Sequence, residues 1–107
     1  MIKRGDVWWV DFSSSKGDIR KRRPAIIVSN NSACQYLNRV QVMPMTSNIG
    51  KLYPSEAYVT FQGRQSKALA DQLVTVSKKR LLEHAGSISM TEMDGVNHAI
   101  AVQLDLL

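Results

Sequence analysis

The hydrophobic and polar positions in the first two thirds of the chain predict a series of short β-strands. Residues 7–12 are aromatic and β-branched, and the serine-containing stretch 13–17 that follows them predicts a loop. Residues 25–29, which are continuously apolar through Val28, are typical of a strand that is covered on both faces. Residues 39–43 and 57–61 alternate between apolar and polar side chains, as half-buried strands do.

Proline and glycine indicate where these strands end. Pro44 has no amide hydrogen to donate, so we expect it at a strand end or at the edge of a sheet. Residues 62–64, which read Gln-Gly-Arg, predict a hairpin turn. A further strand is predicted at 69–76, either straight or bent at Asp71 and Gln72.

The last third of the chain carries helix signals. Ser77 can cap a short helix that runs through Leu82 and is closed by Gly86. Ser89 and Glu92 have the spacing of a capping box and predict the start of a longer final helix. The apolar residues of that helix recur at steps of three and four and are Met93, Val96, Ile100, Leu104 and Leu107. We expect this stripe to pack on the sheet or on a second subunit, and the whole pattern predicts a small antiparallel barrel with a C-terminal helix.

Length and composition narrow the class of protein. A chain of 107 residues predicts one domain with a modest core. Apolar runs stay well short of the roughly 20 residues that span a bilayer. Residues 1–6 are not followed by the apolar block of a signal peptide. We therefore expect a cytoplasmic protein with no membrane contact. Cys34 is the only cysteine, and histidines and acids lack metal-ligand spacing, so neither a metal nor another cofactor is expected. A net charge of +5 favours a polyanionic partner.

Four consecutive cations, at residues 20–23, precede Pro24 and the apolar run after it. Proline biases the preceding residue towards an extended conformation, which places Arg23 at the junction between a basic loop and a rigid strand. A cation held in that place can bind a phosphate group. RNA or DNA is therefore the first partner to consider.

Four blocks, in order along nearly the whole chain, resemble the MazF/PemK family of toxin endoribonucleases. They are RGDVWWVD at 4–11, RPAIIVSN at 23–30, VMPMTS at 42–47 and ALADQL at 68–73. The resemblance implies an SH3-like barrel with a C-terminal helix, as in CcdB and MazF toxins, and a homodimer. It also implies sequence-specific, metal-independent cleavage of single-stranded RNA to 2′,3′-cyclic phosphate and 5′-hydroxyl ends, which inhibits translation and growth. The implied partner is an antitoxin that covers the active groove.

The resemblance places the two catalytic residues of the family at Arg23 and Thr46. In metal-free cleavage the 2′-hydroxyl attacks the phosphorus, and a guanidinium can donate a planar fork of hydrogen bonds to the charged oxygens that develop. The Thr46 hydroxyl can donate to a phosphate oxygen or align the 2′-hydroxyl. Which group acts as base and which as acid stays open, and without the resemblance Thr46 would be taken for a residue that bonds its own backbone.

Further RNA contacts are expected in the basic loop and at four polar positions. Phosphate contacts are expected from Lys16, Arg20, Lys21 and Arg22, beside Gly17. This loop is shorter and more basic than in many relatives, which leaves its part in choosing the RNA sequence open. The four polar positions, each of which could instead cap a helix or form a turn, are Asn30, Ser47, Ser66 and Gln72.

Two aromatic and two histidine residues complete the list of candidates. Neighbouring strand residues point to opposite faces, so we expect Trp9 inside the core and leave open whether Trp8 stacks on bases. His84, predicted at a helix end, and His98, on the final helix, are interpreted as structural. Two other functions remain open: a CcdB-like toxin that poisons a topoisomerase, and an RNA-binding module of the SH3 or Sm type without catalysis.

Overall fold

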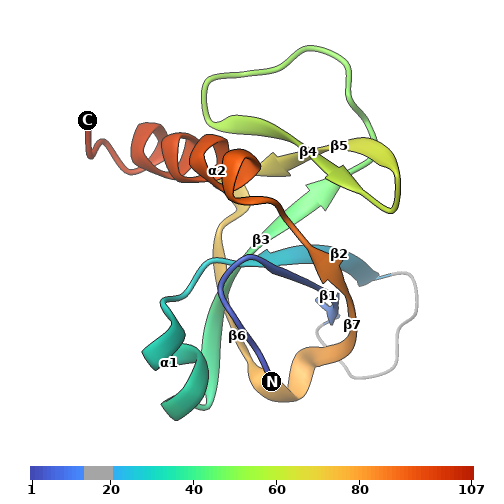
Figure 1. Cartoon of the computed structure of the whole chain (residues 1–107), viewed down its shortest axis with the longest axis vertical. Helices are drawn as coiled ribbons and strands as arrows, with labels where there is room; N and C mark the ends of the chain where they lie inside the picture. The colour runs from blue at the N-terminus through green and yellow to red at the C-terminus, as the bar shows by residue number, and fades with distance from the viewer. Residues whose placement is uncertain (14–20) are drawn as a thin grey trace.

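The protein, described by a computed structural model over residues 1–13 and 21–107, is a curled antiparallel sheet with a helix across one end (Figure 1). Its strands and helices follow one another as β1 (Asp6–Asp11), β2 (Arg22–Ile27), α1 (Asn31–Tyr36), β3 (Arg39–Thr46), β4 (Glu56–Phe61), β5 (Arg64–Leu69), the 3₁₀ helix η2 (Ala70–Gln72), β6 (Val74–Ser77), the 3₁₀ helix η3 (Lys78–Arg80), β7 (Leu81–Ser87) and α2 (Met90–Gln103). The predicted mainly-β architecture with a C-terminal helix is therefore confirmed.

The long strand β3 holds the sheet together. Neighbouring strands pair in the order β4, β5, β3, β2, β1, β7, and β6 pairs with the first half of β3. Pro44 was expected at a strand end or sheet edge, but it lies inside β3, where it pairs with Ala25 of β2. On its other side β3 changes partner, from β6 up to Val42 to β5 from Met45 onwards. Proline is tolerated there because this is the point where the neighbouring strand changes.

Two apolar clusters fill the space on the two sides of β2. Ile26 belongs to the cluster under α2, whereas Ala25 and Ile27 belong to the cluster near α1. This alternation confirms that the run at 25–29 is covered on both faces. The expectation that Trp9 lies inside the core is wrong, since Trp9 is half-buried and lines a surface cleft. Trp8, which was left open, packs against the second cluster.

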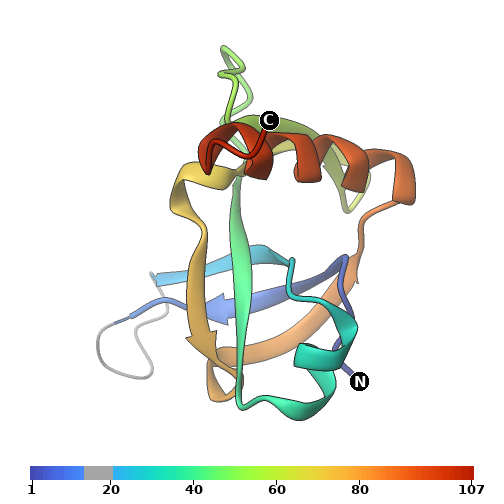
Figure 2. The same ribbon diagram turned by 90° about the vertical axis from the view of Figure 1, so that its left-hand side faces the viewer.

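The helix α2 lies across one end of the curled sheet (Figure 2). Its residues Met93, Val96 and Ala99 are buried in the first cluster, which confirms that the predicted stripe packs on the sheet. The end of the stripe does not pack in the same way, because Leu104 is 51% and Leu107 is 79% exposed.

Ser89 starts this helix as predicted, although the Glu92 side chain bonds Thr60 and does not complete a capping box with the Ser89 amide. Ser89 is the N-cap, and its Oγ accepts the amide hydrogen of Glu92 at 3.1 Å. Substituting Ser89→Ala is expected to lower the free energy of unfolding by about 1 kcal/mol, because one amide at the helix start loses its partner. Chemical denaturation checks this, with the exposed helix residue Thr91 changed to alanine as the control. Equal stability of the two variants would contradict the capping role.

The segment from residue 62 to residue 87 differs in part from the prediction. The hairpin turn is confirmed, with positive φ angles of 52° at Gln62 and 76° at Gly63, as a two-residue type I′ turn requires. The strand expected at 69–76 is instead interrupted by η2, and β6 begins only at Val74. Ser77 does cap a helix, through its bond to the amide of Lys79.

That helix is a single turn, and the residues after it form a strand. The segment 81–87 is β7, which pairs with β1, so Gly86 ends no helix and His84 lies on a strand. This pairing with a distant segment outweighs the local helix signal. The sequence pattern does not predict the helix α1. Its N-cap is Asn30, for which a capping role is one of the two alternatives given above.

Candidate active site

The two residues expected to be catalytic line one cleft. The cleft lies between β1, β2, β3 and the β4–β5 hairpin and has a volume of about 330 Å³. Its lining residues are Trp9, Arg23, Pro24, Met45, Thr46, Ser47, Phe61 and Ser66. Arg23 and Thr46 come from β2 and β3, which pair directly, so neighbouring strands set their spacing.

The Arg23 guanidinium is held by two acceptors. Its Nη1 donates to Gln72 Oε1 at 3.0 Å, and its Nη2 donates to the carbonyl oxygen of Met45 at 3.1 Å. These bonds use two of the five N–H groups of an arginine, which leaves donors for a phosphate. The half-buried side chain is thus oriented before any substrate binds.

Thr46 ends β3 with its hydroxyl oriented by the next turn. Its Oγ1 accepts the amide hydrogen of Asn48 at 3.2 Å, which is the local backbone bond considered from the sequence. Because Oγ1 is the acceptor in that bond, the hydroxyl hydrogen can still be donated to an oxygen of a substrate.

Aromatic side chains form another wall of the cleft. The rings of Trp9 and Phe61 meet edge to face, with centroids 6.2 Å apart and planes at 66°. Aromatic surfaces of this kind accept stacked bases without regard to sequence. The sequence analysis missed Phe61, although the alternation of 57–61 places it on the same face of β4 as Val59 and Ala57.

A second cavity continues the cleft. Its volume is about 720 Å³, and its lining residues are Ser47, Ile49, Phe61, Gln62, Arg64, Gln65 and Ser66. Ser47, Phe61 and Ser66 line both cavities. We call the two together the groove. Its second part adds an arginine and two amides that the sequence analysis did not single out.

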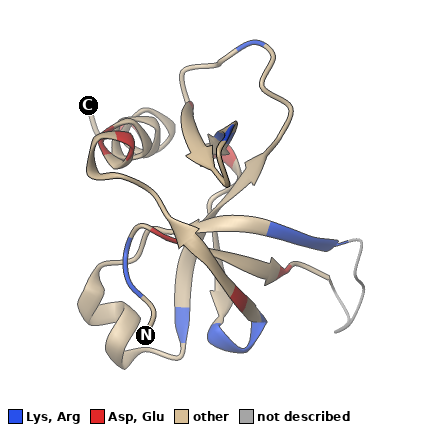
Figure 3. Cartoon of the chain, turned by 45° about the vertical axis from the view of Figure 1, so that its right-hand side comes forward, with Lys and Arg blue, Asp and Glu red and all other residues tan. Residues whose placement is uncertain are grey.

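Apart from Asn30, the remaining predicted RNA contacts divide into three groups. Ser47 and Ser66 line the groove, and Gln72 accepts a hydrogen bond from Arg23. Lys21 and Arg22 are exposed where β2 begins, which Figure 3 shows as a basic strand end. The predicted contacts Lys16, Gly17 and Arg20 lie outside the described residues.

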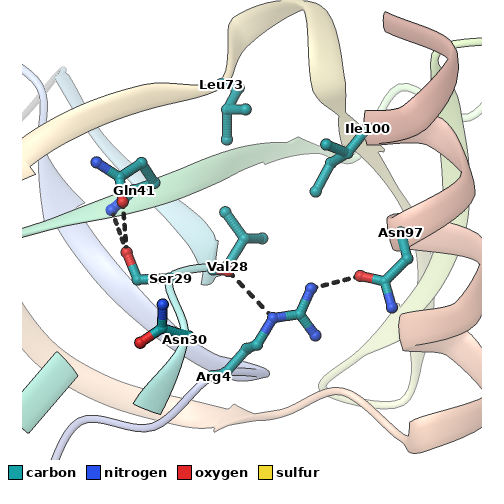
Figure 4. Close-up of a pocket in the computed structure, with 8 residues that line it drawn as sticks. All are labelled: Arg4, Val28, Ser29, Asn30, Gln41, Leu73, Asn97 and Ile100. Carbon is teal, nitrogen blue, oxygen red and sulfur yellow. Dashed lines mark hydrogen bonds between the residues drawn. The ribbon is translucent and has the colours of Figure 1, made fainter. Parts of the chain in front are cut away.

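Asn30 lines a different pocket, shown in Figure 4. Its Oδ1 accepts the amide hydrogen of Ala33 at 2.8 Å, so the residue caps α1. The pocket beside it holds Arg4, whose Nε donates to the carbonyl of Val28 at 3.1 Å and whose Nη2 donates to Asn97 (Figure 4). This pocket has no lining residue in common with the groove, so the structure does not bring Asn30 together with Arg23.

The histidines lie elsewhere. His84 is exposed on β7, where its Nε2 is 3.6 Å from Asp6 Oδ1 and its ring meets Trp8 at 5.5 Å. His98 is exposed on α2. Over residues 1–13 and 21–107, no group of three or more histidine, cysteine or acidic side chains could hold a metal ion. Helices in the same ranges are too short and too polar to span a membrane.

Comparison with known proteins decides the family. Residues 3–104 match the model of the PemK-like, MazF-like toxins of type II toxin–antitoxin systems. The chain belongs to this family. The endoribonuclease MazF9 of Mycobacterium tuberculosis is 36% identical over 116 residues, which cover 99% of this chain and 98% of that protein. The family predicted from the four sequence blocks is thereby confirmed, and the enzyme class predicted with it agrees with the name of this relative.

Solved structures of MazF-type proteins share the fold. An endoribonuclease in complex with its cognate antitoxin, from a mycobacterial species, matches with a TM-score of 0.85 and 23% identity over 100% of this chain and 98% of that one. MazF from Deinococcus radiodurans matches with a TM-score of 0.79 and 23% identity over 97% and 96% of the two chains. These likenesses confirm the predicted MazF-like barrel with a C-terminal helix.

Proposed function

We propose that this member of the MazF family is an endoribonuclease toxin that cleaves single-stranded RNA at specific sequences. The observation that carries the proposal is the oriented Arg23 guanidinium in the same cleft as the Thr46 hydroxyl. The 36% identity to an endoribonuclease supports the reaction class. An aromatic wall beside these two residues supports an unpaired, base-stacking substrate.

In the proposed reaction the 2′-hydroxyl oxygen attacks the adjacent phosphorus and loses its proton. The bond from phosphorus to the 5′-oxygen breaks, and that oxygen leaves as a hydroxyl after receiving a proton. The products are a 2′,3′-cyclic phosphate and a 5′-hydroxyl end. Arg23 stabilises the extra negative charge of the pentacoordinate phosphorus through paired N–H donors.

Arg23 is assigned to charge stabilisation and not to proton removal. The pKa of an arginine side chain lies above about 12, so its neutral form is scarce at neutral pH. Thr46 is assigned to hydrogen bonding with a non-bridging oxygen or the 2′-hydroxyl, for which its fixed Oγ1 is suited. Cleavage in this scheme requires no metal ion.

The test is a cleavage assay on a long single-stranded RNA in the presence of EDTA, with both product ends mapped. Cuts at a few sites that carry cyclic phosphate and 5′-hydroxyl ends are expected. Intact RNA that still binds the protein would favour the RNA-binding module. Intact RNA with no binding would favour the topoisomerase poison.

Substituting Thr46→Val is expected to reduce kcat by about 100-fold, because one preorganised donor is lost while the shape of the side chain is retained. The control is Thr91→Val, which removes an exposed hydroxyl on α2 outside the groove. Single-turnover cleavage of a short RNA that contains one mapped site measures the effect. Equal cleavage rates for the two variants would show that the Thr46 hydroxyl has no role in the reaction.

We propose that an antitoxin segment occupies the same groove and that two copies of the toxin form a dimer. The matched mycobacterial endoribonuclease was solved with its antitoxin, and a MazE–MazF complex from Deinococcus radiodurans matches with a TM-score of 0.77. A groove that contains arginines suits an acidic antitoxin segment as well as RNA. Co-expression with the cognate antitoxin is expected to restore growth that the toxin alone arrests by inhibiting translation.

A further inference from the structure

Lys67 is a buried lysine whose charge is not available to RNA. The residue is 7% exposed, and lysine is rarely buried to this extent without a partner. Its Nζ lies 2.8 Å from Glu56 Oε1 and donates to the carbonyl oxygen of Lys51 at 2.9 Å. Lys67 also pairs with Thr46 across β3 and β5, so these bonds form beside the proposed catalytic residue.

Two neighbours of Lys67 bind the same stretch of chain. The Tyr58 hydroxyl donates to the carbonyl oxygens of Gly50 at 3.0 Å and Ile49 at 3.3 Å. Glu56 Oε1 accepts the amide hydrogen of Tyr53 at 3.0 Å. The three side chains therefore bind backbone groups of residues 49, 50, 51 and 53.

These backbone groups belong to the β3–β4 loop, residues 47–55, which rises at the top of Figure 1. Ser47 and Ile49 of this loop line the groove. Its larger apolar side chains contribute little burial, since Ile49, Leu52 and Tyr53 are 39%, 42% and 53% exposed. A loop that buries little apolar surface depends on its polar contacts for a fixed position.

We propose that Lys67, Glu56 and Tyr58 are positioning residues that fix the β3–β4 loop as a wall of the groove. This inference rests on the proposed ribonuclease function. The catalytic pair stands on strands β2 and β3, outside the loop. The loop reaches the pair through the Asn48 amide, which bonds Thr46 Oγ1, whereas the Tyr58 hydroxyl bonds residues 49 and 50. Loosening the loop at residues 49 and 50 is therefore expected to weaken RNA binding more than it slows the chemical step.

The deciding variant is Tyr58→Phe, which removes only the hydroxyl group and leaves the ring on β4. Loss of these hydrogen bonds is expected to speed hydrogen exchange of amides in residues 47–55 and to raise KM for RNA by roughly tenfold, with a much smaller change in kcat. The matched control is Thr60→Val on the same strand, because its hydroxyl bonds Glu92 of α2 at 2.9 Å and touches no loop residue. The control is expected to leave loop exchange and KM unchanged.

The outcomes separate this inference from the proposed function. A wild-type protein that leaves RNA intact would overturn both. A wild type that cleaves RNA, beside a Tyr58→Phe variant with unchanged loop exchange, would overturn the positioning role alone. Faster loop exchange with an unchanged KM would also overturn it, because the loop would then be fixed for stability and not for binding.

Discussion

Replacing Arg23 with lysine is expected to reduce the rate of RNA cleavage by about 1000-fold, at the upper end of the effect of removing one oriented donor group. Lysine keeps the positive charge but has a single nitrogen, so it cannot bind two phosphate oxygens with a planar fork. It also cannot bind Gln72 and the Met45 carbonyl in the geometry that orients the guanidinium. The loss should appear in kcat more than in KM, because the fork acts on charge that develops in the transition state.

Single-turnover kinetics at saturating RNA measures this effect. The matched control is Arg22→Lys, since Arg22 is the exposed neighbour on the same strand and a charge-conserving change there should leave kcat near the wild-type value. Cleavage by Arg23→Lys at close to the wild-type rate would show that charge alone is sufficient. The paired hydrogen bonds assigned to Arg23 would then be wrong.

Substituting Lys67→Met is expected to lower the free energy of unfolding by about 1–3 kcal/mol at neutral pH. The change leaves the Glu56 carboxylate, 13% exposed, without its cationic partner. The methylene chain is retained, so the loss reports the charge and not the packing. Replacing both residues, as Lys67→Met with Glu56→Leu, should recover most of the loss, because two uncharged side chains need no compensation.

Denaturation at neutral and at acidic pH tests whether the Lys67–Glu56 pair stabilises the fold through its charges. The hydrogen bond from Lys67, followed by the one from the Tyr53 amide, lowers the pKa of Glu56 below its ordinary value. A carboxyl whose pKa is lower in the folded state stabilises the protein above its unfolded pKa, and this contribution is lost as the pH falls through the folded value. The stability difference between wild type and Lys67→Met should therefore narrow in acid. A difference that stays constant down to pH 3 would contradict the electrostatic origin.

Local patterns could be predicted from the sequence because their signals are short in range. The alternation of 57–61, the turn at Gln62 and Gly63, and the cap at Ser89 each depend on residues within one element. Arg23 was indicated both by its position before Pro24 and by the family blocks. Thr46 was located by the family blocks alone, since a lone threonine at a strand end has an equally good backbone role. The predicted roles of Arg23 and Thr46 stay predictions until cleavage is measured.

What could not be predicted depends on pairing between distant segments. The strand β7 exists because residues 81–87 pair with β1, and nothing in their local pattern distinguishes them from a short helix. The side on which Trp9 lies follows from how the sheet curls, which alternation alone does not fix. Lys67 was missed because residues 64–69 carry no alternating pattern that predicts a strand, and a lysine is ordinarily expected to face water.

Met45 connects the two proposed catalytic groups through the backbone, because its carbonyl oxygen binds Arg23 and its peptide continues into Thr46. One peptide unit of β3 therefore sets the spacing of the two proposed catalytic groups. Ser47 and Ile49, which line the groove, belong to the loop that follows. The proposed chemistry therefore depends on β2 and β3, whereas part of the proposed RNA-binding surface lies on the loop, which bonds Thr46 through the Asn48 amide. Exchanging residues 49–55 while keeping Ser47 and Asn48 is then expected to change the cutting site and to leave the Asn48–Thr46 hydrogen bond in place.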